Sequence, residues 1–471
     1  MRSSMLMMIA PALLVATIPA AAQPVDVDAA FAFAGAQLAA THAVVPAGSY
    51  PHYTYAGGAW NIPAYRAWTC GFFPQSLWAL YERTGDVAWR TMAEARTGPI
   101  APDRYKTDTH DLGFMLHNSF GYGHRLTGNP TYKSIDLQAA ASLATRYNAN
   151  VGAIKSWDFQ EPFPVIIDNM MNLELLFWSA ANGGPSSHAD IAIQHAITTA
   201  REHVRADGSS YHVVDFNPTT GLPAARPGEP DPYRTHQGLH DESTWSRGQA
   251  WGLYGFTMTY RYADDPRFLA TARLMADWYI DHLPADSVPY WDFDAPASPA
   301  TPRDSSAAAI AASGLLELAE YVDGADRIRY IDSAEAALAS LAGPNYLAAG
   351  TNNQAILQHG TYNYNGDVGV DAGLTWGDAY FLEALLRYES LMASLDGGDA
   401  DRDGDVDLDD FVILKQHFGA AGGWTDGDFD GDGDVDLDDF VILKQHFGAA
   451  AIPEPTALAL LALGGLARRR R

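Results

Sequence analysis

The sequence predicts an all-α fold: an (α/α)6 barrel of six helical hairpins, followed by a small duplicated loop–helix segment. Three observations predict the barrel. Helical periodicity of apolar residues recurs from about residue 26 to 394, with few strand-like runs. Tight turns join the helices in pairs. Longer connections, rich in aromatic and polar residues, lead from one pair to the next.

The helix pairs are recognised by their turns. In Thr84-Gly85-Asp86 and in Thr127-Gly128-Asn129-Pro130, glycine ends the first helix, and Asp, Asn or Pro begins the second. Similar turns occur at 182–185, 264–266 and 323–324. The twelve expected helices span 26–41, 71–83, 86–97, 112–127, 130–147, 169–182, 187–205, 246–262, 265–282, 305–322, 326–342 and 377–394.

Short turns make the two helices of each pair antiparallel neighbours. The long connections therefore gather at the opposite end of the pairs; they span 42–70, 98–111, 148–168, 206–245, 283–304 and 343–376. Twelve helices could also stack as an open solenoid. No repeat of fixed period supports a solenoid, so we expect a closed barrel over residues 23–395.

Composition excludes several classes of protein. The chain has 471 residues, of which 47% are hydrophobic, and this is too apolar for a disordered protein. A single cysteine excludes an intramolecular disulfide framework and a cluster of thiolate metal ligands. The formal net charge of −27 disfavours nucleic acid and anionic lipid as partners.

Both ends of the chain predict export. Residues 1–22 combine Arg2, an apolar run over 5–18 and small residues at 20–22, which is typical of a cleaved signal peptide. Residues 450–471 resemble a PEP-CTERM sorting signal, with Pro-Glu-Pro, an apolar stretch too short to span a bilayer, and four terminal arginines. The resemblance implies a sorting protease and a protein that is exported to the cell surface, the outer membrane or the exterior of a Gram-negative-type bacterium.

A calcium-binding repeat is expected over residues 396–449. Residues 403–419 and 432–448 are identical and lie 29 positions apart. Carboxylates recur with the spacing of a calcium loop, in which glycine makes the sharp turn and an acidic residue closes the shell. The expected metal ligands are Asp399, Asp401, Asp403, Asp405 and Asp410 in the first loop, and Asp428, Asp430, Asp432, Asp434 and Asp439 in the second.

Each loop leads into an apolar helical run, and the pair resembles a type I dockerin. The resemblance implies bound Ca²⁺ and either a cohesin-like receptor or a calcium-stiffened spacer. A solvated acidic linker is the alternative. Residues 396–448 hold 16 Asp against three basic residues, so a charge of −13 belongs to this segment and says little about a substrate.

Polar and aromatic residues collect where the long connections lead into helices. Six segments stand there: 68–74, 110–114, 167–173, 245–251, 303–307 and 375–378. If alternate helices form an inner ring, the six helix N-termini meet in one cavity. Their free N–H groups and positive dipole ends then favour an anionic ligand.

Two of these aspartates are candidates for acid/base catalysis. An Asp at a helix start is ordinarily a cap, and Asp304 is assigned that role for the helix at 305–322. Asp168 lies between an apolar run and two methionines, so we expect burial to raise its pKa and keep it protonated as a general acid. Asp111 follows His110 and suits a carboxyl that stays ionised or shares a proton. Two carboxyls whose surroundings separate their pKa values are typical of acid/base catalysis.

Six motifs in order carry a resemblance to unsaturated glucuronyl hydrolases, glycoside hydrolase family 88, over about residues 45–393. They are WTCGFFP, THDLGF, IDNMMNL, THQG, SRGQAWGLYG and RDSSAAA. The resemblance implies that Asp168 is the general acid/base and Asp111 the second essential carboxylate. It implies that substrate is bound by Trp68, His110, His212, Gln237, Arg247 and Trp251.

Simpler roles stay open for several of these residues. His212 lies in a variable loop, where a lone histidine is more often a surface residue. Trp68 and Trp251 could be core aromatics, although a flat apolar face also suits stacking on a sugar ring. Arg247 could meet a carboxylate of the substrate in a fork, or hold Asp111 or a loop in place.

The implied reaction is removal of the 4,5-unsaturated uronic acid that polysaccharide lyases leave on oligosaccharides. Asp168 would protonate C4 of the vinyl ether, water would add to C5, and the resulting hemiketal would open. No cofactor is expected for catalysis. Three alternatives stay open: an unsaturated rhamnogalacturonyl hydrolase, a conventional inverting glycosidase on the same barrel, and a non-catalytic surface adhesin.

Overall fold

The computed structural model describes residues 25–160, 162–395 and 397–448. The predicted signal peptide and sorting signal lie outside these residues. The barrel helices are α1 (Val27–Val44), α2 (Phe72–Thr84), α3 (Val87–Thr97), the π-helix η3 (Gly113–Gly121) continued by α4 (Tyr122–Thr127), α5 (Pro130–Ala144), α6 (Asn169–Ala181), α7 (Ser187–Glu202), α8 (Ser246–Ala263), α9 (Pro266–Asp281), α10 (Ser305–Ala319), α11 (Gly324–Ala342) and α12 (Thr375–Ser394).

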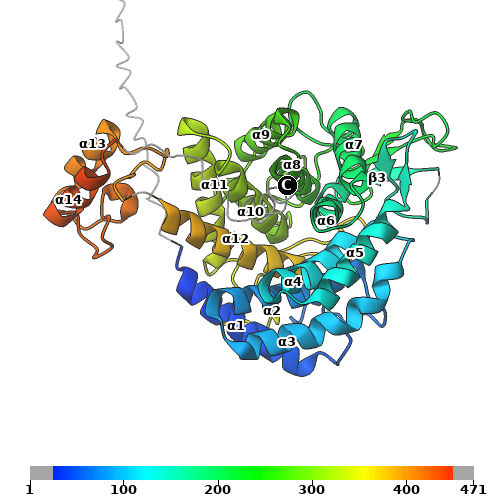
Figure 1. Cartoon of the computed structure of the whole chain (residues 1–471), viewed down its shortest axis with the longest axis horizontal. Coiled ribbons are helices and arrows are strands. Elements are labelled where there is room, and N and C mark those ends of the chain that lie inside the picture. The colour runs from blue at the N-terminus through cyan, green and yellow to red at the C-terminus, as the bar shows by residue number, and fades with distance from the viewer. Residues whose placement is uncertain (1–24, 161, 396, 449–471) are drawn as a thin grey trace, which may run out of the picture.

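Six helical segments form a closed inner ring (Figure 1). Each contacts the next in the order α2, η3, α6, α8, α10, α12, and α12 contacts α2. The outer helices α3, α5, α7, α9 and α11 each follow an inner helix in the chain and pack against it, and α1 contacts α12. The contact between α12 and α2 closes the ring, which confirms the predicted helical barrel and excludes an open solenoid.

Burial separates inner from outer helices. All fifteen residues of α10 are buried. This helix is mostly Ala, Ser, Gly and Leu, and a Cβ at Gly314 would lie 2.7 Å from Leu253 Cδ2 of α8, so small side chains allow the close approach of its neighbours. In the outer helix α11, buried residues such as Tyr330, Ala334 and Leu338 recur at helical spacing on one face.

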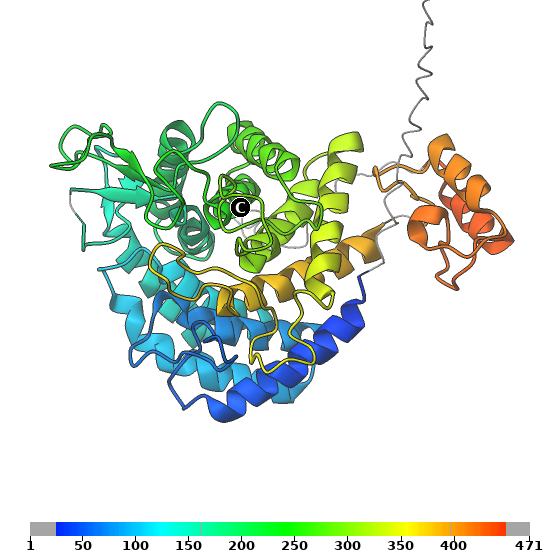
Figure 2. The same cartoon turned by 180° about the vertical axis from the view of Figure 1, so that it is seen from behind.

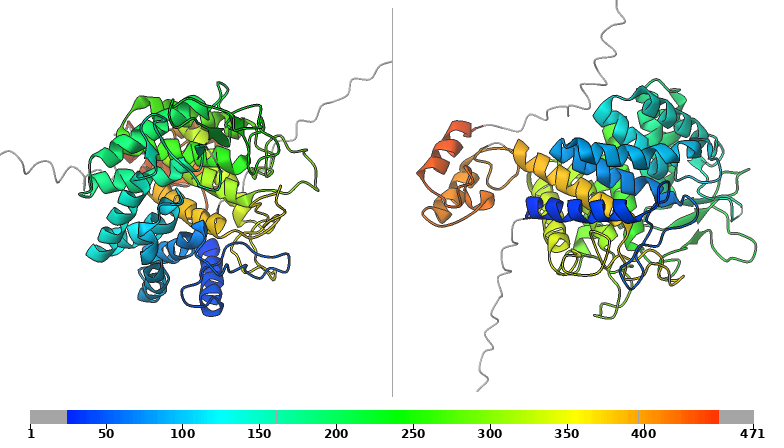
Figure 3. Two further views of the ribbon diagram at one scale, coloured as in Figure 1. Left: turned by 90° about the vertical axis from the view of Figure 1, so that its right-hand side faces the viewer. Right: turned by 90° about the horizontal axis from the view of Figure 1, so that it is seen from below.

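The tight turns have the predicted chemistry. Gly85 and Gly128 end α2 and α4 in the left-handed region, with φ of 67° in both. Asp86 and Asn129 cap the following helices, because their side chains accept hydrogen bonds from Ala88 N and Thr131 N. These turns leave the long connections on one face of the barrel (Figure 2, Figure 3).

The long connections also contain two small antiparallel sheets, which the sequence analysis did not predict. Strands β1 (Tyr147–Asn148) and β2 (Ala153–Ile154) form one. Strands β3 (Pro164–Ile166), β4 (Val213–Asp215) and β5 (Tyr233–Arg234) form the other, in that spatial order. Connections from successive hairpins lie side by side here, and their buried main-chain groups pair with one another.

The duplicated segment forms a separate small core beside α11 and α12 (Figure 1). It contains α13 (Leu408–His417), the short 3-10 helix η4 (Trp424–Asp426) and α14 (Leu437–His446). Its core is built by the buried residues Ala400, Val406, Leu414, Phe429, Val435 and Leu443. Among the helices that the structure describes, none has both the length and the apolar character needed to cross a bilayer.

A buried ion network lies inside the barrel, toward the C-terminal ends of the inner helices. Glu317 of α10 is ion-paired with Arg261 Nη1 of α8 at 3.0 Å and with Arg387 Nη2 of α12 at 2.8 Å. Glu317 is buried, and Tyr254 and Glu383 extend the network. The network therefore links three consecutive helices of the inner ring.

We expect Glu317→Ala to lower the free energy of unfolding by about 3 kcal/mol, because it removes the buried partner of two guanidinium groups that are themselves only partly exposed. Urea denaturation followed by circular dichroism measures the loss. Asp326→Ala is the matched control: it breaks an exposed ion pair with Arg273 and should cost less than about 1 kcal/mol. Equal effects of the two substitutions would contradict the assignment.

Candidate active site

Asp168 lies between β3 and the first turn of α6. It makes no capping hydrogen bond, its side chain is buried, and its Oδ2 has no hydrogen-bond partner. Burial, with a smaller contribution from the charge of Asp111, raises the pKa of Asp168 to about 7 against the opposing charge of Arg247. Asp168 therefore does not cap α6, and its burial agrees with the environment expected of a protonated carboxyl.

The three-stranded sheet brings His212 to Asp168. Ile167 N donates to His212 O at 3.1 Å, one residue beyond the pairing of β3 with β4. His212 Nδ1 accepts from the N–H groups of His236 and Gln237 at 3.2 and 3.3 Å, so the proton of the neutral ring is on Nε2. Burial holds the pKa of His212 well below its usual value, which keeps the ring neutral.

His212 Nε2 lies 3.8 Å from Asp168 Oδ2, and neither atom has a hydrogen-bond partner. Both atoms are buried, so each has a hydrogen-bonding capacity that no group of the described residues satisfies. The structure thus brings together two residues that are 44 positions apart in the sequence. His212 is not the surface residue that its variable loop suggested.

Asp111 reaches the same region at the start of η3. Its Oδ2 accepts a hydrogen bond from Thr109 Oγ1 at 2.6 Å, and its Oδ1 lies 3.3 Å from Nε2 of the buried His110. Asn172 of α6 fixes this segment, because its Oδ1 accepts from Phe114 N at 2.9 Å. A Cβ at Gly113 would lie 2.7 Å from that Oδ1, so only glycine allows η3 to start this close to α6.

Arg247 is buried close to Asp168 and contacts a loop and the cap of α10. Its guanidinium is buried, donates from Nη1 to Asp304 Oδ2 at 2.7 Å and to Thr361 O, and donates from Nη2 to Tyr362 O at 2.6 Å. The group also lies 4.4 Å from the Trp245 ring centre. These contacts agree with the alternative that Arg247 holds a loop, here the connection 343–376. A direct contact with substrate stays a prediction.

Asp304 does more than the sequence analysis assigned to it. It caps α10 as predicted, because its Oδ1 accepts from Ser306 N at 3.1 Å. Its other oxygen binds Arg247, and both side chains are buried. No pattern in the sequence indicated this pair, since 57 residues separate the partners.

The two predicted tryptophans differ in exposure. Trp68 is half-buried and donates from Nε1 to Tyr362 Oη at 3.4 Å, with its ring centre 5.1 Å from that of Trp376. Trp251 has 0% of its surface exposed and packs 5.1 Å from the Phe114 ring, which is the core alternative. Gln237 is half-buried and donates from Nε2 to Tyr362 O at 2.8 Å.

Several residues at the site were not singled out from the sequence. His236, within the THQG motif, lies with its ring 5.5 Å from Trp157, which stacks on the exposed Phe159 at 5.0 Å. Main-chain pairing of Trp157 with Thr109 places this aromatic group next to Asp111. Tyr362 contacts Trp68, Gln237 and Arg247. Long connections contain Trp157, Phe159 and Tyr362. That position was the feature of the sequence that could have indicated them as site residues.

The predicted metal ligands divide into two groups. Ligand oxygens of Asp399, Asp401 and Asp403 lie within 4.8 Å of one another, and so do those of Asp428, Asp430 and Asp432. Asp399 is buried with an unpartnered Oδ1, as expected of a ligand for a hard cation. Asp405 and Asp434 lie outside these groups, at the loop position that ordinarily binds through its main-chain carbonyl. Asp410 and Asp439 lie in the first turns of α13 and α14, where their Oδ2 atoms accept from the N–H groups of the capping residues Asp407 and Asp436. These residues fit calcium.

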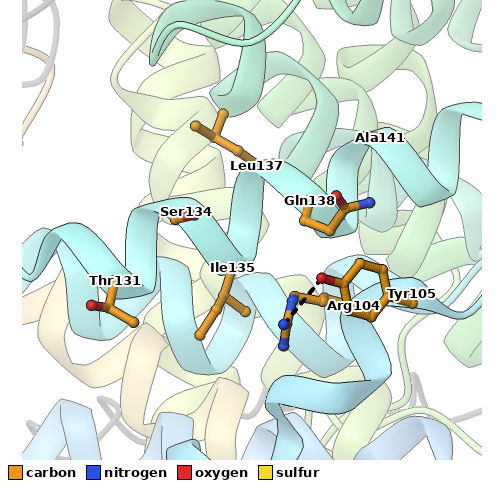
Figure 4. A pocket seen from close by; sticks show the side chains of 8 residues that line it. All are labelled: Arg104, Tyr105, Thr131, Ser134, Ile135, Leu137, Gln138 and Ala141. Atoms are coloured by element: carbon orange, nitrogen blue, oxygen red, sulfur yellow. Dashed lines mark hydrogen bonds between the residues drawn. The ribbon is translucent and has the colours of Figure 1, made fainter.

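A surface hollow of about 470 Å³ lies away from these sites, between α5 and the 3-10 helix η2 (Gly98–Tyr105) (Figure 4). Arg104 covers the Tyr105 ring at 4.4 Å there, and Gln138 and Ile135 form part of the wall. The hollow contains no residue of the Asp111–Asp168 site.

Known proteins resemble this chain over more than two thirds of its length. No family model matches it. The chain is 42% identical over 339 residues to the unsaturated glucuronyl hydrolase of Formosa agariphila, covering 70% of this chain and 82% of that protein. It is 37% identical over 349 residues to the unsaturated glucuronyl hydrolase of Bacillus sp. (strain GL1), covering 72% and 91%.

Solved structures that resemble this chain are of the same kind of enzyme as the relatives found by sequence. A crystal structure of an unsaturated glucuronyl hydrolase specific for heparin has a TM-score of 0.74 and 40% identity, covering 78% of this chain and 98% of that one. A variant of the Streptococcus agalactiae enzyme in complex with dGlcA-GalNAc6S has a TM-score of 0.68 and 30% identity, covering 79% and 94%. Identity at this level over most of both chains shows that the protein belongs to the unsaturated glucuronyl hydrolase family, glycoside hydrolase family 88.

Proposed function

We propose that this enzyme removes the terminal 4,5-unsaturated uronic acid from lyase-made oligosaccharides by hydrating the C4=C5 bond, with Asp168 as the general acid. The observation that carries the proposal is the buried, unpartnered Oδ2 of Asp168 opposite His212 Nε2. A carboxyl with a pKa of about 7 holds a transferable proton near neutral pH.

The reaction begins with the transfer of the Asp168 proton to C4, the nucleophilic carbon of the vinyl ether. Positive charge then develops at C5 and the ring oxygen. Water adds to C5, and Asp168 or Asp111 takes the proton that this water loses. The resulting hemiketal opens without further help, which releases the shortened oligosaccharide and a 4-deoxy-5-keto uronate.

The surroundings of the two carboxyls suit an acidic sugar. The inner helices begin where the long connections end, so their N-termini lie on the same side of the barrel as the two carboxyls. Their N–H groups and dipoles favour a carboxylate. His212 adds an Nε2–H donor without adding charge. Trp68 offers an aromatic face, and Gln237 and Arg247 hold the loop at Tyr362 that lies beside it.

The relatives suggest which polysaccharides to test first. One solved relative is described as specific for heparin, and relatives from three streptococci are unsaturated chondroitin disaccharide hydrolases. We therefore propose unsaturated disaccharides of glycosaminoglycans as the first substrate class.

Export and calcium binding are part of the same proposal. The sequence features at 1–22 and 450–471 support an exported enzyme at the cell surface or outside. The two carboxylate groups support Ca²⁺ in the repeat, which serves either a cohesin-like receptor or a stiffened spacer. An exported enzyme would meet lyase products and millimolar calcium in the same compartment.

Asp168→Asn should lower kcat by about 10²–10⁴-fold, because the amide has no acidic proton. In the unsubstituted enzyme, kcat/KM should fall about tenfold per pH unit above pH 7, as Asp168 loses its proton. Initial rates on an unsaturated chondroitin disaccharide between pH 5 and 9 measure both.

Asp378→Asn is the matched control, since burial also raises the pKa of Asp378 to about 7. Its carboxylate is bound by the N–H groups of Ile356 and Leu357, so this variant should keep the fall in kcat/KM above pH 7.

The pH dependence of the melting temperature distinguishes the loss of a catalytic group from misfolding of the variant. A raised folded-state pKa destabilises the protein as pH rises from about 4 to 7, so Asp168→Asn should melt above the unsubstituted enzyme at pH 8 but not at pH 4. Unchanged turnover in Asp168→Asn would remove the proposal.

Hydration and conventional glycoside hydrolysis give different optical signals. Hydration destroys the double bond conjugated with the carboxylate, so the ultraviolet absorbance of the substrate should vanish in step with sugar release. The saturated analogue of the same disaccharide should not be cleaved. Sugar release with constant absorbance, or cleavage of the saturated analogue, would favour an inverting glycosidase.

Titration of the full chain with Ca²⁺ should give two bound ions, and removal of calcium by a chelator should destabilise the repeat while leaving the hydrolysis rate unchanged. Asp403→Ala and Asp432→Ala should each remove one ion, because each takes a carboxylate from one group. Isothermal titration calorimetry counts the ions. Two ions in either variant would contradict the assignment of these loops.

A further inference from the structure

The two halves of the repeat differ in exposure although their sequences agree. Residues 403–419 and 432–448 are identical. Asp401 and Asp403 of the first loop are nevertheless half-buried, whereas Asp430 and Asp432 of the second loop are exposed. The first loop lies against the barrel beside α11 (Figure 1, Figure 3), and the second does not.

Arg402 makes most of this contact. Its Nη1 donates to Glu335 Oε2 at 2.7 Å and its Nη2 to Asp332 Oδ1 at 2.6 Å, both on α11. The side chain is buried and the ion pairs are partly shielded from water. The main chain adds two contacts, from Arg327 Nε to Arg402 O at 3.2 Å and from Gly324 N to Asp403 O at 3.3 Å.

Arg402 also occupies a backbone conformation that disfavours arginine. Its φ is 63°, and the equivalent residue of the second loop is Gly431, with φ of 74°. A loop of this shape accepts glycine without strain, and the second loop has it. The arginine in the first loop is compensated by its contacts with α11, which the glycine of the second loop does not make.

We infer that Arg402 docks the repeat on the barrel through α11, and that calcium binding by the first loop and this docking strengthen each other. The inference rests on the calcium sites proposed above. Asp399 supports it independently, because its buried Oδ1 faces the other carboxylates without a partner. The two peptide units that contact Arg327 and Gly324 flank Asp403, one of the expected ligands of the first loop. A cation that fixes these units favours docking, and by reciprocity docking favours the cation.

Direct electrostatics and docking predict opposite effects of removing Arg402. The loss of a positive charge and of a strained φ from an acidic loop would strengthen calcium binding. Loss of docking would weaken it. A weaker first site in Arg402→Gly is therefore diagnostic of docking.

The test uses the full chain and calorimetric titration with Ca²⁺. Arg402→Gly gives the first loop the residue of the second, and we expect about a fivefold or greater loss of affinity at one of two sites. Asp332→Asn combined with Glu335→Gln removes the partners on α11 without touching the loop and should give the same loss. Gly431→Arg, the matched control, should not change the affinity of the first loop.

A distance measurement reads docking directly. The only cysteine, Cys70, is buried, so spin labels attach selectively to Ala325→Cys on α11 and Gln445→Cys on α14. With Ca²⁺ the distance distribution should be narrow in the parent chain and broad in Arg402→Gly. Identical distributions, or an unchanged or tighter first site, would overturn the inference. Absence of calcium uptake by the parent chain would overturn the calcium proposal and the coupling together, but not the hydrolase.

Discussion

A carboxyl group held out of water at the start of α6 is the constraint on which the site depends. Three remote parts of the chain produce it. The apolar residues of β3 bury Asp168, the pairing of β3 with β4 presents His212, and the close start of η3 brings Asp111. Because desolvation, rather than a bound partner, raises the pKa of Asp168, any change that admits water to this corner acts on the chemistry first.

The buried Arg247 acts against the effect of desolvation on Asp168. Its charge lowers the pKa of Asp168 while burial raises it, which leaves the carboxyl close to neutral pH. The same guanidinium joins α8 to the cap of α10 and to the loop at Thr361 and Tyr362. The electrostatic and the structural role of Arg247 are therefore inseparable, since moving the loop also moves the charge.

The helices could be predicted because residues close in the sequence determine where they begin and end. The strands and the side-chain pairs of the site depend on contacts between distant parts of the chain and could not be predicted. Glycine and capping residues such as Gly128 and Asn129 fixed the hairpins, and the run before Asp168 indicated burial. The strands escaped notice because each has two or three residues, and the pairing of β3 with β4 joins two separate connections. The pair of Arg247 with Asp304, and the core position of Trp251, depend on how the ring closes, which no sequence spacing encodes.

The π-helix η3 has a consequence for how this site tolerates change in chain length. Its wide turns accommodate one residue more than a regular α-helix of the same rise, a device often found at functional sites. Each residue of a helix turns the chain by about 100°. A one-residue deletion in a regular α-helix would therefore rotate Asp111 away from Asp168, whereas a deletion within Gly113–Gly121 removes the extra residue and leaves the two ends of the segment close to their present register. The irregular segment is thus the part of this helix whose length can change with the least effect on the position of the second carboxyl.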